Sequence, residues 1–292
     1  MAMTQSQAVA DELTRRTGRA VELVGVTTYG DVTRTHLAQL GGTGVFVNAL
    51  RDRLLTGEID FAVHSLKDLP TKPADGVAMA ALPARDDPRD ALIARDGAKL
   101  ADLPAGGTVG TGSPRRVAQL RRLRPDLAYV PIRGNADTRL GKVHAGELDA
   151  VVLAYAGLAR IGRLDEVTEA FDTDALLPAP GQGSLAVECV SGCPGLIDLL
   201  AVIDDASTRA AVTAERAVLA TLEAGCSAPV GAYAVVHDGA VHLRAVAVST
   251  DGGTAVRMAR SGPPTQAEQL GRALASEMLA QGAAELIGEP AR

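Results

Sequence analysis

The chain has 292 residues, of which 47% are hydrophobic and 22% are charged, the composition of a folded globular protein rather than of a disordered chain. Its formal net charge of −6 argues against a general nucleic-acid binder. No apolar run reaches the roughly 18 residues that a membrane span needs, and the first residues lack the order of a signal peptide. We therefore expect a cytoplasmic protein of two or three domains, with no nucleic-acid or membrane partner.

Helices and strands alternate along the first half of the chain. Hydrophobic periodicity predicts helices at 4–16, 45–55, 114–123 and 135–145. It predicts strands at 21–27, 59–63, 76–81, 91–94, 107–110, 127–132 and 149–153. Alternation of this kind indicates α/β layers with largely parallel sheets. Farther along, a helix at 207–225, three short strand signals and a helix near 265–281 predict a smaller α+β domain.

Two short segments between these elements are rich in proline. Residues 82–92 ("LPARDDPRDAL") and 176–184 ("LLPAPGQGS") are predicted to be crossovers between lobes. Two other stretches resemble each other, "GEIDFAVHS" from Gly57 and "GELDAVVLA" from Gly146. Both are expected at a corner where a helix gives way to a buried strand.

The segment "EIDFAVHSLKDLP" (58–70) places Lys67 and Asp68 directly after a predicted strand. Loops after strands are common places for chemistry in α/β proteins. A solvated turn with a surface ion pair explains the same residues equally well. This stretch alone leaves both interpretations open.

Seven arginines and only two aspartates lie between Ser113 and Arg139. We interpret Arg121, Arg122 and Arg124 as a solvated helix face. The remaining four are Arg115, Arg116, Arg133 and Arg139.

Arg115 and Arg116 occupy the first turn of a helix that Ser113 is expected to cap. The helix dipole disfavours cations at that end, which indicates a bound anion. Arg133 and Arg139 flank a second helix start, at Asn135. Glycine-rich loops at 41–46 and 180–184 add further backbone donors, but no P-loop lysine follows them. The set predicts a polyanionic ligand, carboxylate or phosphate.

Three cysteines and five scattered histidines limit the other chemistry. Cys189, Cys193 and Cys226 do not indicate a disulfide framework in a reducing compartment. The histidines lack zinc-ligand spacing, so no metal site is predicted. At least one cysteine is expected to be kept for its reactivity.

Six motifs together resemble the porphobilinogen deaminase (hydroxymethylbilane synthase) family, in the right order from about residue 4 to the C-terminus. They are "HSLKDLP" (64–70), "DPRDAL" (87–92), "GTGSPRR" (110–116), "IRGNADTRL" (132–140), "LPAPGQG" (177–183) and "LEAGCSAPVGAY" (222–233).

The resemblance implies a transferase of tetrapyrrole (haem, chlorophyll-type, corrin) biosynthesis. Such enzymes join four porphobilinogen molecules head to tail, with loss of ammonia, to give hydroxymethylbilane. They work on a dipyrromethane cofactor held by a thioether, which the motif position assigns to Cys226. Cys189 and Cys193 match no family site.

The resemblance also implies which residues carry the reaction. Asp68 matches the catalytic aspartate, which assists loss of the amine, stabilises the resulting cation and helps accept a ring proton. The residues implied to bind substrate and cofactor, largely through their carboxylates for the polar and cationic members, are Phe46, Ser65, Lys67, Thr111, Ser113, Arg115, Arg116, Arg133, Arg139 and Gln182. Porphobilinogen and the growing oligopyrrole are the expected partners of a monomer.

The implied fold is α/β, with two lobes like those of periplasmic binding proteins and a third, smaller α+β domain. The expected boundaries are 1–83 with about 184–202 for the first domain, 88–178 for the second and 206–292 for the third. Fold alone does not decide function. A non-catalytic receptor for a carboxylated ligand is the main alternative, and a phosphoryl-transfer enzyme is a weaker one.

Two positions depart from the family pattern. Thr43 stands where many relatives carry lysine. The matching region also opens after the strand and "GTR-x-S-x-LA" loop with which relatives begin. We expect from this that the 292 residues are a shortened version of the functional protein.

Overall fold

The computed structural model describes residues 1–26, 43–225 and 228–287, with side chains omitted for residues 43–46. The chain divides into two units. Unit 1 comprises Met1–Arg85 and Ser184–Arg209, and unit 2 comprises Asp86–Gly183 and Ala210–Arg292. The chain thus passes between the units three times. Two of these points lie inside the proline-rich segments that were predicted as crossovers, and the third, between Arg209 and Ala210, lies inside helix α8 (Ala206–Thr221).

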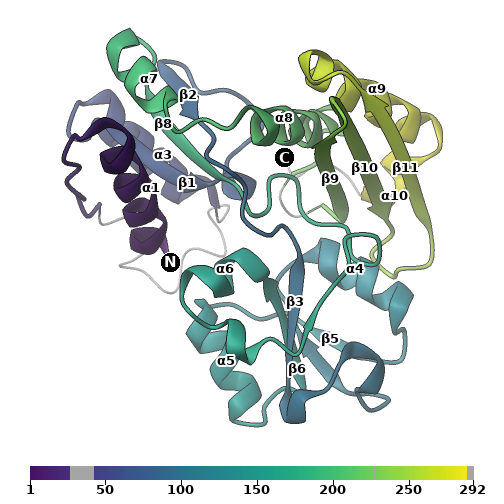
Figure 1. Ribbon diagram of the computed structural model, residues 1–292. Coiled ribbons are helices and arrows are strands. Elements are labelled where there is room, and N and C mark those ends of the chain that lie inside the picture. The colour runs from purple at the N-terminus through teal and green to yellow at the C-terminus, as the bar shows by residue number, and fades with distance from the viewer. Residues whose placement is uncertain (27–42, 226–227, 288–292) are drawn as a thin grey trace. The chain divides into compact units, whose positions relative to one another are not determined.

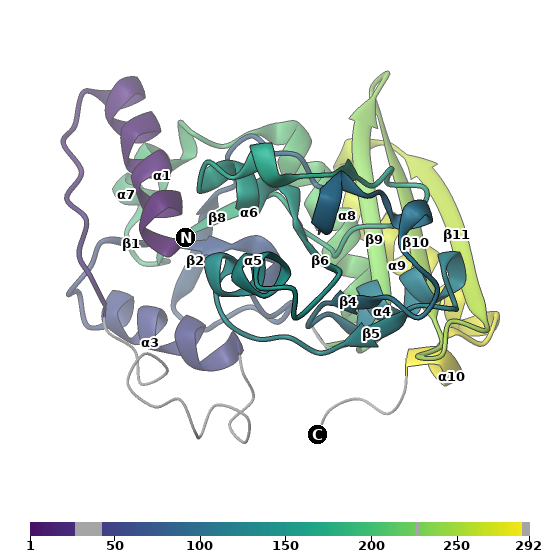
Figure 2. The same cartoon turned by 90° about the horizontal axis from the view of Figure 1, so that it is seen from below.

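Unit 1 is a small antiparallel sheet with helices on both faces. Its strands are ordered β1-β8-β2, so the strand that arrives last in the chain lies in the centre. Helices α1 and α7 pack on one face and α3 on the other (Figure 2). The bounds are α1 Ala2–Thr17, α3 Thr43–Leu55, β1 Phe61–Ser65, β2 Val77–Ala81, β8 Leu185–Val190 and α7 Pro194–Ala201.

Alternation along the strands decides which side chains meet which helix. In β1, Phe61 and Val63 pack in the core with Val9 and Leu13 of α1. The intervening residues of β1 point to the opposite face, where α3 lies. A short 3₁₀ turn, η1 (Leu66–Asp68), follows β1 directly.

The first part of unit 2 is a mixed five-stranded sheet of order β5-β4-β6-β3-β7. Strand β4 is parallel to both its neighbours, whereas β3 is antiparallel to β6 and β7. The bounds are β3 Asp90–Ala94, β4 Thr108–Gly110, α4 Pro114–Leu123, β5 Ala128–Val130, α5 Ala136–His144, β6 Ala150–Ala154, α6 Tyr155–Arg160 and β7 Glu169–Ala170.

The second part of unit 2 is an antiparallel sheet of order β11-β10-β9 (Figure 1). Helices α8 and α9 share one buried apolar core with this sheet. They approach so closely that a side chain on Gly271 would strike the carbonyl of Ala214. The bounds are α8 Ala206–Thr221, β9 Val230–His237, β10 Ala240–Val248, β11 Ala255–Gly262, α9 Ala267–Ala280 and α10 Ala283–Ile287.

The predicted α/β class is confirmed, but two predictions of its details are wrong. The sheets are not largely parallel, since every pairing in unit 1 is antiparallel among the described residues. The predicted strand at 21–27 is also absent as far as residue 26, where the description stops. Residues 21–26 have the alternation of a strand, but no described segment pairs with them, and a strand requires a ladder partner.

The predicted domain boundaries stay a prediction. Unit 1 consists of two chain segments, Met1–Arg85 and Ser184–Arg209. Residues 86–183 and 210–292 fall in one unit, so the separation of a second from a third domain stays a prediction. None of the described helices is long and apolar enough to cross a bilayer.

Candidate active site

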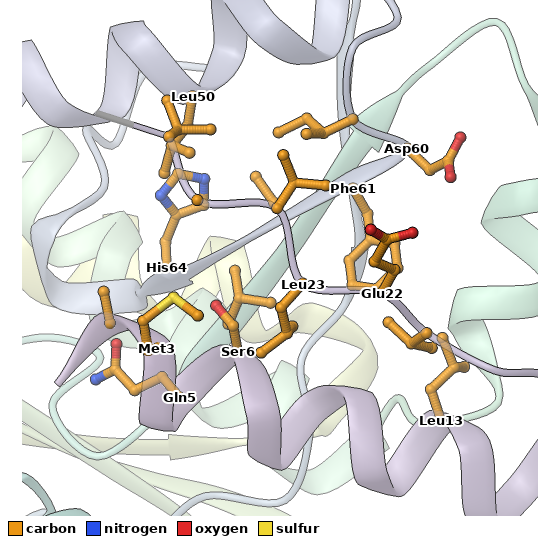
Figure 3. A pocket seen from close by; sticks show the side chains of 18 of the residues that line it. Met3, Gln5, Ser6, Leu13, Glu22, Leu23, Leu50, Asp60, Phe61 and His64 are labelled. Carbon is orange, nitrogen blue, oxygen red and sulfur yellow. The ribbon is translucent and has the colours of Figure 1, made fainter. Parts of the chain in front are cut away.

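The loop after β1 holds Asp68 at the edge of a cavity within unit 1. The cavity has a volume of about 1010 Å³, and Asp68, Ser65 and His64 belong to its lining. Figure 3 shows His64 among the lining side chains. The buried side chains of Leu66 and Leu69 anchor the turn, and the Leu66 N–H donates to the Ser184 carbonyl at 3.0 Å. The carboxylate therefore sits on a well-supported backbone and is partly exposed.

The neighbours of Asp68 in this loop are polar. The Ser65 hydroxyl accepts a hydrogen bond from the amide of Gln5 on α1, at 2.9 Å. Lys67 is partly exposed in the same turn. The apolar strand thus ends in a group of polar side chains beside a cavity, which favours chemistry over a solvated turn.

In unit 2, helix α4 begins as the sequence predicts. The Ser113 hydroxyl accepts from the Arg116 N–H at 3.4 Å, and Pro114 occupies the first turn. Thr111 is buried, and its hydroxyl accepts from the Ser113 N–H at 3.3 Å. The local cap signals therefore fix the start of the helix that carries Arg115.

Arg115 and Arg116 are buried, and they share one fully buried carboxylate, that of Asp90 on β3. Arg115 Nη2 lies 2.8 Å from Asp90 Oδ2, and Arg116 Nη2 lies 2.7 Å from Oδ1. Arg115 also donates to the Leu177 carbonyl at 2.7 Å, and Arg116 to the Val152 carbonyl at 3.0 Å. The anion nearest this helix start is therefore part of the protein.

Asp90 remains ionised in this setting. Burial disfavours its charge, but the charges of Arg115 and Arg116, with hydrogen bonds from Arg116 and Gln182, lower its pKa to about 2. The Gln182 amide donates to Asp90 at 2.8 Å and to the Pro88 carbonyl at 2.7 Å. Two guanidinium groups against one carboxylate leave this cluster with a net positive charge.

Helix α5 begins beside two further arginines. Asn135 caps it by accepting from the Thr138 N–H at 2.8 Å. Arg139 donates to the Gly134 carbonyl at 2.9 Å, and burial together with the charge of Arg116 lowers its pKa. Arg133 is exposed. Within the described parts of the chain, neither Arg133 nor Arg139 has a carboxylate partner, so both are available to an external anion.

Comparison with known proteins decides the family. The family model described as "Porphobilinogen deaminase, dipyromethane cofactor binding domain" matches residues 1–196, and "Porphobilinogen deaminase, C-terminal domain" matches residues 209–280. The porphobilinogen deaminase of Thermobifida fusca is 63% identical over 300 residues, covering 100% of this chain and 94% of that protein. This chain belongs to the porphobilinogen deaminase family.

Other relatives agree with the porphobilinogen deaminase assignment. Porphobilinogen deaminase 1 of Streptomyces coelicolor is 59% identical, over 100% of this chain and 96% of its own length. The Nocardia farcinica porphobilinogen deaminase is 55% identical, over 100% of this chain and 86% of its own length. As a porphobilinogen deaminase, the chain is a transferase of tetrapyrrole biosynthesis that makes hydroxymethylbilane and carries a dipyrromethane cofactor.

Two solved structures are similar at lower levels. The Bordetella pertussis BvgS VFT2 domain is 22% identical with a TM-score of 0.41, over 67% of this chain and 75% of that one. An ancestral cationic amino acid solute binding protein is 19% identical with a TM-score of 0.43, over 67% and 76%. Likenesses at this level add nothing to the porphobilinogen deaminase assignment.

Two porphobilinogen deaminase residues predicted from the motifs lie outside the description. Cys226 is in an undescribed stretch, and the side chain of Phe46 is omitted. Cys189 is buried, which raises the pKa of its thiol, whereas Cys193 is exposed. The amide of Gln182 donates hydrogen bonds within the protein, to Pro88 and Asp90. Its predicted role in binding substrate stays a prediction.

Sequence reasoning missed the acidic partners of the buried cations. Asp90 opens an otherwise apolar strand, and Glu188 interrupts the apolar strand "LAVECV". A single charge in a buried strand is a usable signal, because such a charge requires a partner. The partners themselves lie far away in the sequence, and no local pattern identifies them.

Proposed function

We propose that this chain condenses porphobilinogen with Asp68 as its catalytic carboxylate, the arginines of unit 2 as its carboxylate-binding groups, and Cys226 as the cofactor attachment point. The observation that carries the proposal is the position of Asp68, partly exposed beside a cavity in the turn after β1. The family assignment supplies the reaction, and the site supplies groups suited to it.

The task of Asp68 follows from the charge that develops on the substrate. Loss of ammonia from porphobilinogen leaves a cation, and a later step releases a ring proton. A fixed carboxylate stabilises the first and helps to accept the second. The buried anchors Leu66 and Leu69 hold the turn, so Asp68 does not have to reorganise during the reaction.

The arginines suit a ligand with many carboxylates. Arg133 and Arg139 have no acidic partner among the described residues, and the cluster at Asp90 carries an excess positive charge. Arginine forks bind carboxylates in a bidentate manner. We assign the substrate side chains and those of the cofactor to these cations, with Thr111 and Ser113 as polar neighbours.

The described residues also fit the dipyrromethane cofactor. Its carboxylates can bind Arg133 and Arg139, which have no acidic partner among the described residues. When bound, this group supplies the pyrrole chain to which new units are added. Cys226 holds it through a thioether, since a thiolate is a better carbon nucleophile at neutral pH than a hydroxyl. We further propose that the enzyme is a cytoplasmic monomer, which cell fractionation and light scattering test.

The decisive experiment replaces Asp68 by Asn. We expect Asp68→Asn to fold and to keep its covalent cofactor, but to consume porphobilinogen about 10²–10³ times more slowly, the usual loss for a group that stabilises charge in a transition state. Asp60→Asn is the matched control, because Asp60 lines the same cavity.

Intact mass supplies a second measurement. The wild type and Asp68→Asn should both carry the mass of two pyrrole units, and Cys226→Ser should lack it. Normal turnover by Asp68→Asn would remove Asp68 from the mechanism. A folded wild type with the mass of the bare chain would favour a carboxylate-binding receptor instead.

A further inference from the structure

Three titratable side chains meet inside unit 1, on the face of the sheet opposite α1. Arg51 of α3 binds Glu188 of β8 in a bidentate manner, with Nε to Oε2 at 2.9 Å and Nη2 to Oε1 at 2.7 Å. His64 of β1 brings Nε2 within 3.3 Å of Glu188 Oε2. The exposed fractions of these side chains are only 12% for Arg51, 4% for Glu188 and 5% for His64. We call this group the Arg51–Glu188–His64 cluster.

Strand register explains why these residues meet. Ala62 lies directly opposite Glu188 across the β1–β8 pair, so His64 is the diagonal neighbour of Glu188 on the same face. Helix α3 covers that face and supplies Arg51. Figure 3 shows the His64 ring beside Leu50, which adjoins Arg51 on α3.

Stability alone does not account for such a cluster. The desolvation cost of a buried ion pair roughly cancels its attraction, and a well-packed apolar pair is often as stable or more so. A bidentate pair does fix geometry, because its two parallel hydrogen bonds set both the distance between the guanidinium and carboxylate groups and the plane in which they lie. The cluster therefore specifies where α3, β8 and the end of β1 lie relative to one another.

The cluster adjoins the proposed catalytic loop. His64 is the last residue before Ser65, and η1 with Asp68 follows at once. The His64 ring contacts Glu188 and also belongs to the lining of the cavity that Asp68 and Ser65 share. His64 therefore connects Glu188 to the end of β1. If the contact with Glu188 were lost, the end of β1 could shift, and the turn that carries Asp68 would shift with it.

The charge of the cluster matters as well as its shape. Arg51 neutralises Glu188, so the cluster adds no net negative charge behind a site that must hold a substrate with several carboxylates. Without Arg51, Glu188 would either stay an unpaired buried anion or take up a proton. Both outcomes change the charge of the group that lies 3.3 Å from His64 Nε2.

We propose that Arg51 is a positioning residue for the reaction, acting through Glu188 and His64 on the turn that carries Asp68. This inference rests on the proposed role of Asp68, and nothing in it requires Arg51 to touch substrate.

The test compares four variants with the wild type by kcat, KM for porphobilinogen, melting temperature and cofactor mass. Arg51→Met should lower kcat by about ten- to a hundredfold, as expected for a small displacement of a catalytic group, with KM within about twofold of the wild-type value. Arg51→Lys, which keeps the charge, should recover part of kcat. Arg53→Met is the matched control, since Arg53 lies on the same helix in an exposed ion pair with Glu58.

The double variant Arg51→Met/Glu188→Met separates positioning from stability. It replaces the buried pair by an apolar pair, so its melting temperature should return toward that of the wild type while kcat stays low. Recovery of kcat together with melting temperature would overturn the proposal, as would normal kcat in Arg51→Met. If Arg51→Met fails to fold, the lysine and double variants still decide. Failure of the role of Asp68 is detected separately, by normal turnover in Asp68→Asn.

Discussion

Among the described residues, Asp90 is the one acidic partner of two buried arginines of unit 2. Its oxygens contact both Arg115 and Arg116, and it is completely buried. Any change that removes its charge leaves two guanidinium groups facing each other out of water. Asp90 therefore stabilises the folded state by compensating the buried charges of Arg115 and Arg116.

We predict that Asp90→Asn lowers the free energy of unfolding by about 3–5 kcal/mol, the usual cost of leaving a buried charge unpaired. Urea unfolding measures the change. Asp87→Asn is the control, because Asp87 pairs with Arg89 in a more exposed position and should cost about 0–1 kcal/mol. Equal losses in the two variants would mean that the arginines find other partners.

Two elements of the structure repeat the same local design. The corner between α3 and β1 and the corner between α5 and β6 each contain a glycine with φ of 73°, Gly57 and Gly146. In each corner the following glutamate donates its N–H to the carbonyl five residues earlier, at 3.0 and 2.9 Å. The similar sequences "GEIDFAVHS" and "GELDAVVLA" therefore adopt the same backbone conformation at the two corners.

We predict that Gly57→Ala and Gly146→Ala each lower the free energy of unfolding by about 1–2 kcal/mol, because a left-handed backbone disfavours a side chain. Gly141→Ala should have the opposite sign. Gly141 lies inside α5 with no atom within 4 Å of an added Cβ, so alanine should stabilise the helix by about 0.5–1 kcal/mol. A stabilising result at Gly57 would show that the corner tolerates another conformation.

The elements also show which features the sequence predicts. Helix α4 begins as predicted because its signals, Ser113 and Pro114, are adjacent in the chain. Strand direction was predicted wrongly, because unit 1 pairs β1 with β8 from a distant segment. Residues 21–26 have a strand pattern but no described partner. At the site, motifs predict Asp68 and the arginines as functional residues, and this stays a prediction. The buried contacts of Asp90 with Arg115 and Arg116, and of Glu188 with Arg51, could be seen only in the fold.

For the whole molecule, two buried carboxylates predict how stability depends on pH. Burial opposes the ionisation of Glu188, but hydrogen bonds from His64 and Arg51 lower its pKa from 4.5 to about 2. The pKa of Asp90 falls from 3.8 to about 2. Both groups bind protons more weakly when folded. Their stabilisation is therefore present above about pH 4.5 and is lost as the pH falls toward 2.

We predict that the urea midpoint of the wild type falls as the pH drops from about 4.5 toward 2, with Glu188 contributing on the order of 3 kcal/mol over that range by the usual conversion of a pKa shift. Glu188→Gln cannot titrate at this position. Its unfolding midpoint should start lower and change less over the same range, while Asp60→Asn should follow the wild type. Parallel curves for the wild type and Glu188→Gln would contradict the assignment.

The placement of β8 in the centre of the unit 1 sheet has a consequence for synthesis. β1 and β2 do not pair with each other, and the strand that joins them begins at Leu185. As the chain emerges from the ribosome, β1 and β2 must wait for their partner β8 while the segment that forms the five-stranded sheet is made. That sheet is continuous in sequence, from Asp90 to Ala170, and can form first. The sheet of unit 1, whose first strands are made earliest, is thus completed late. Chaperones therefore have the longest access to β1, the apolar strand that precedes Asp68.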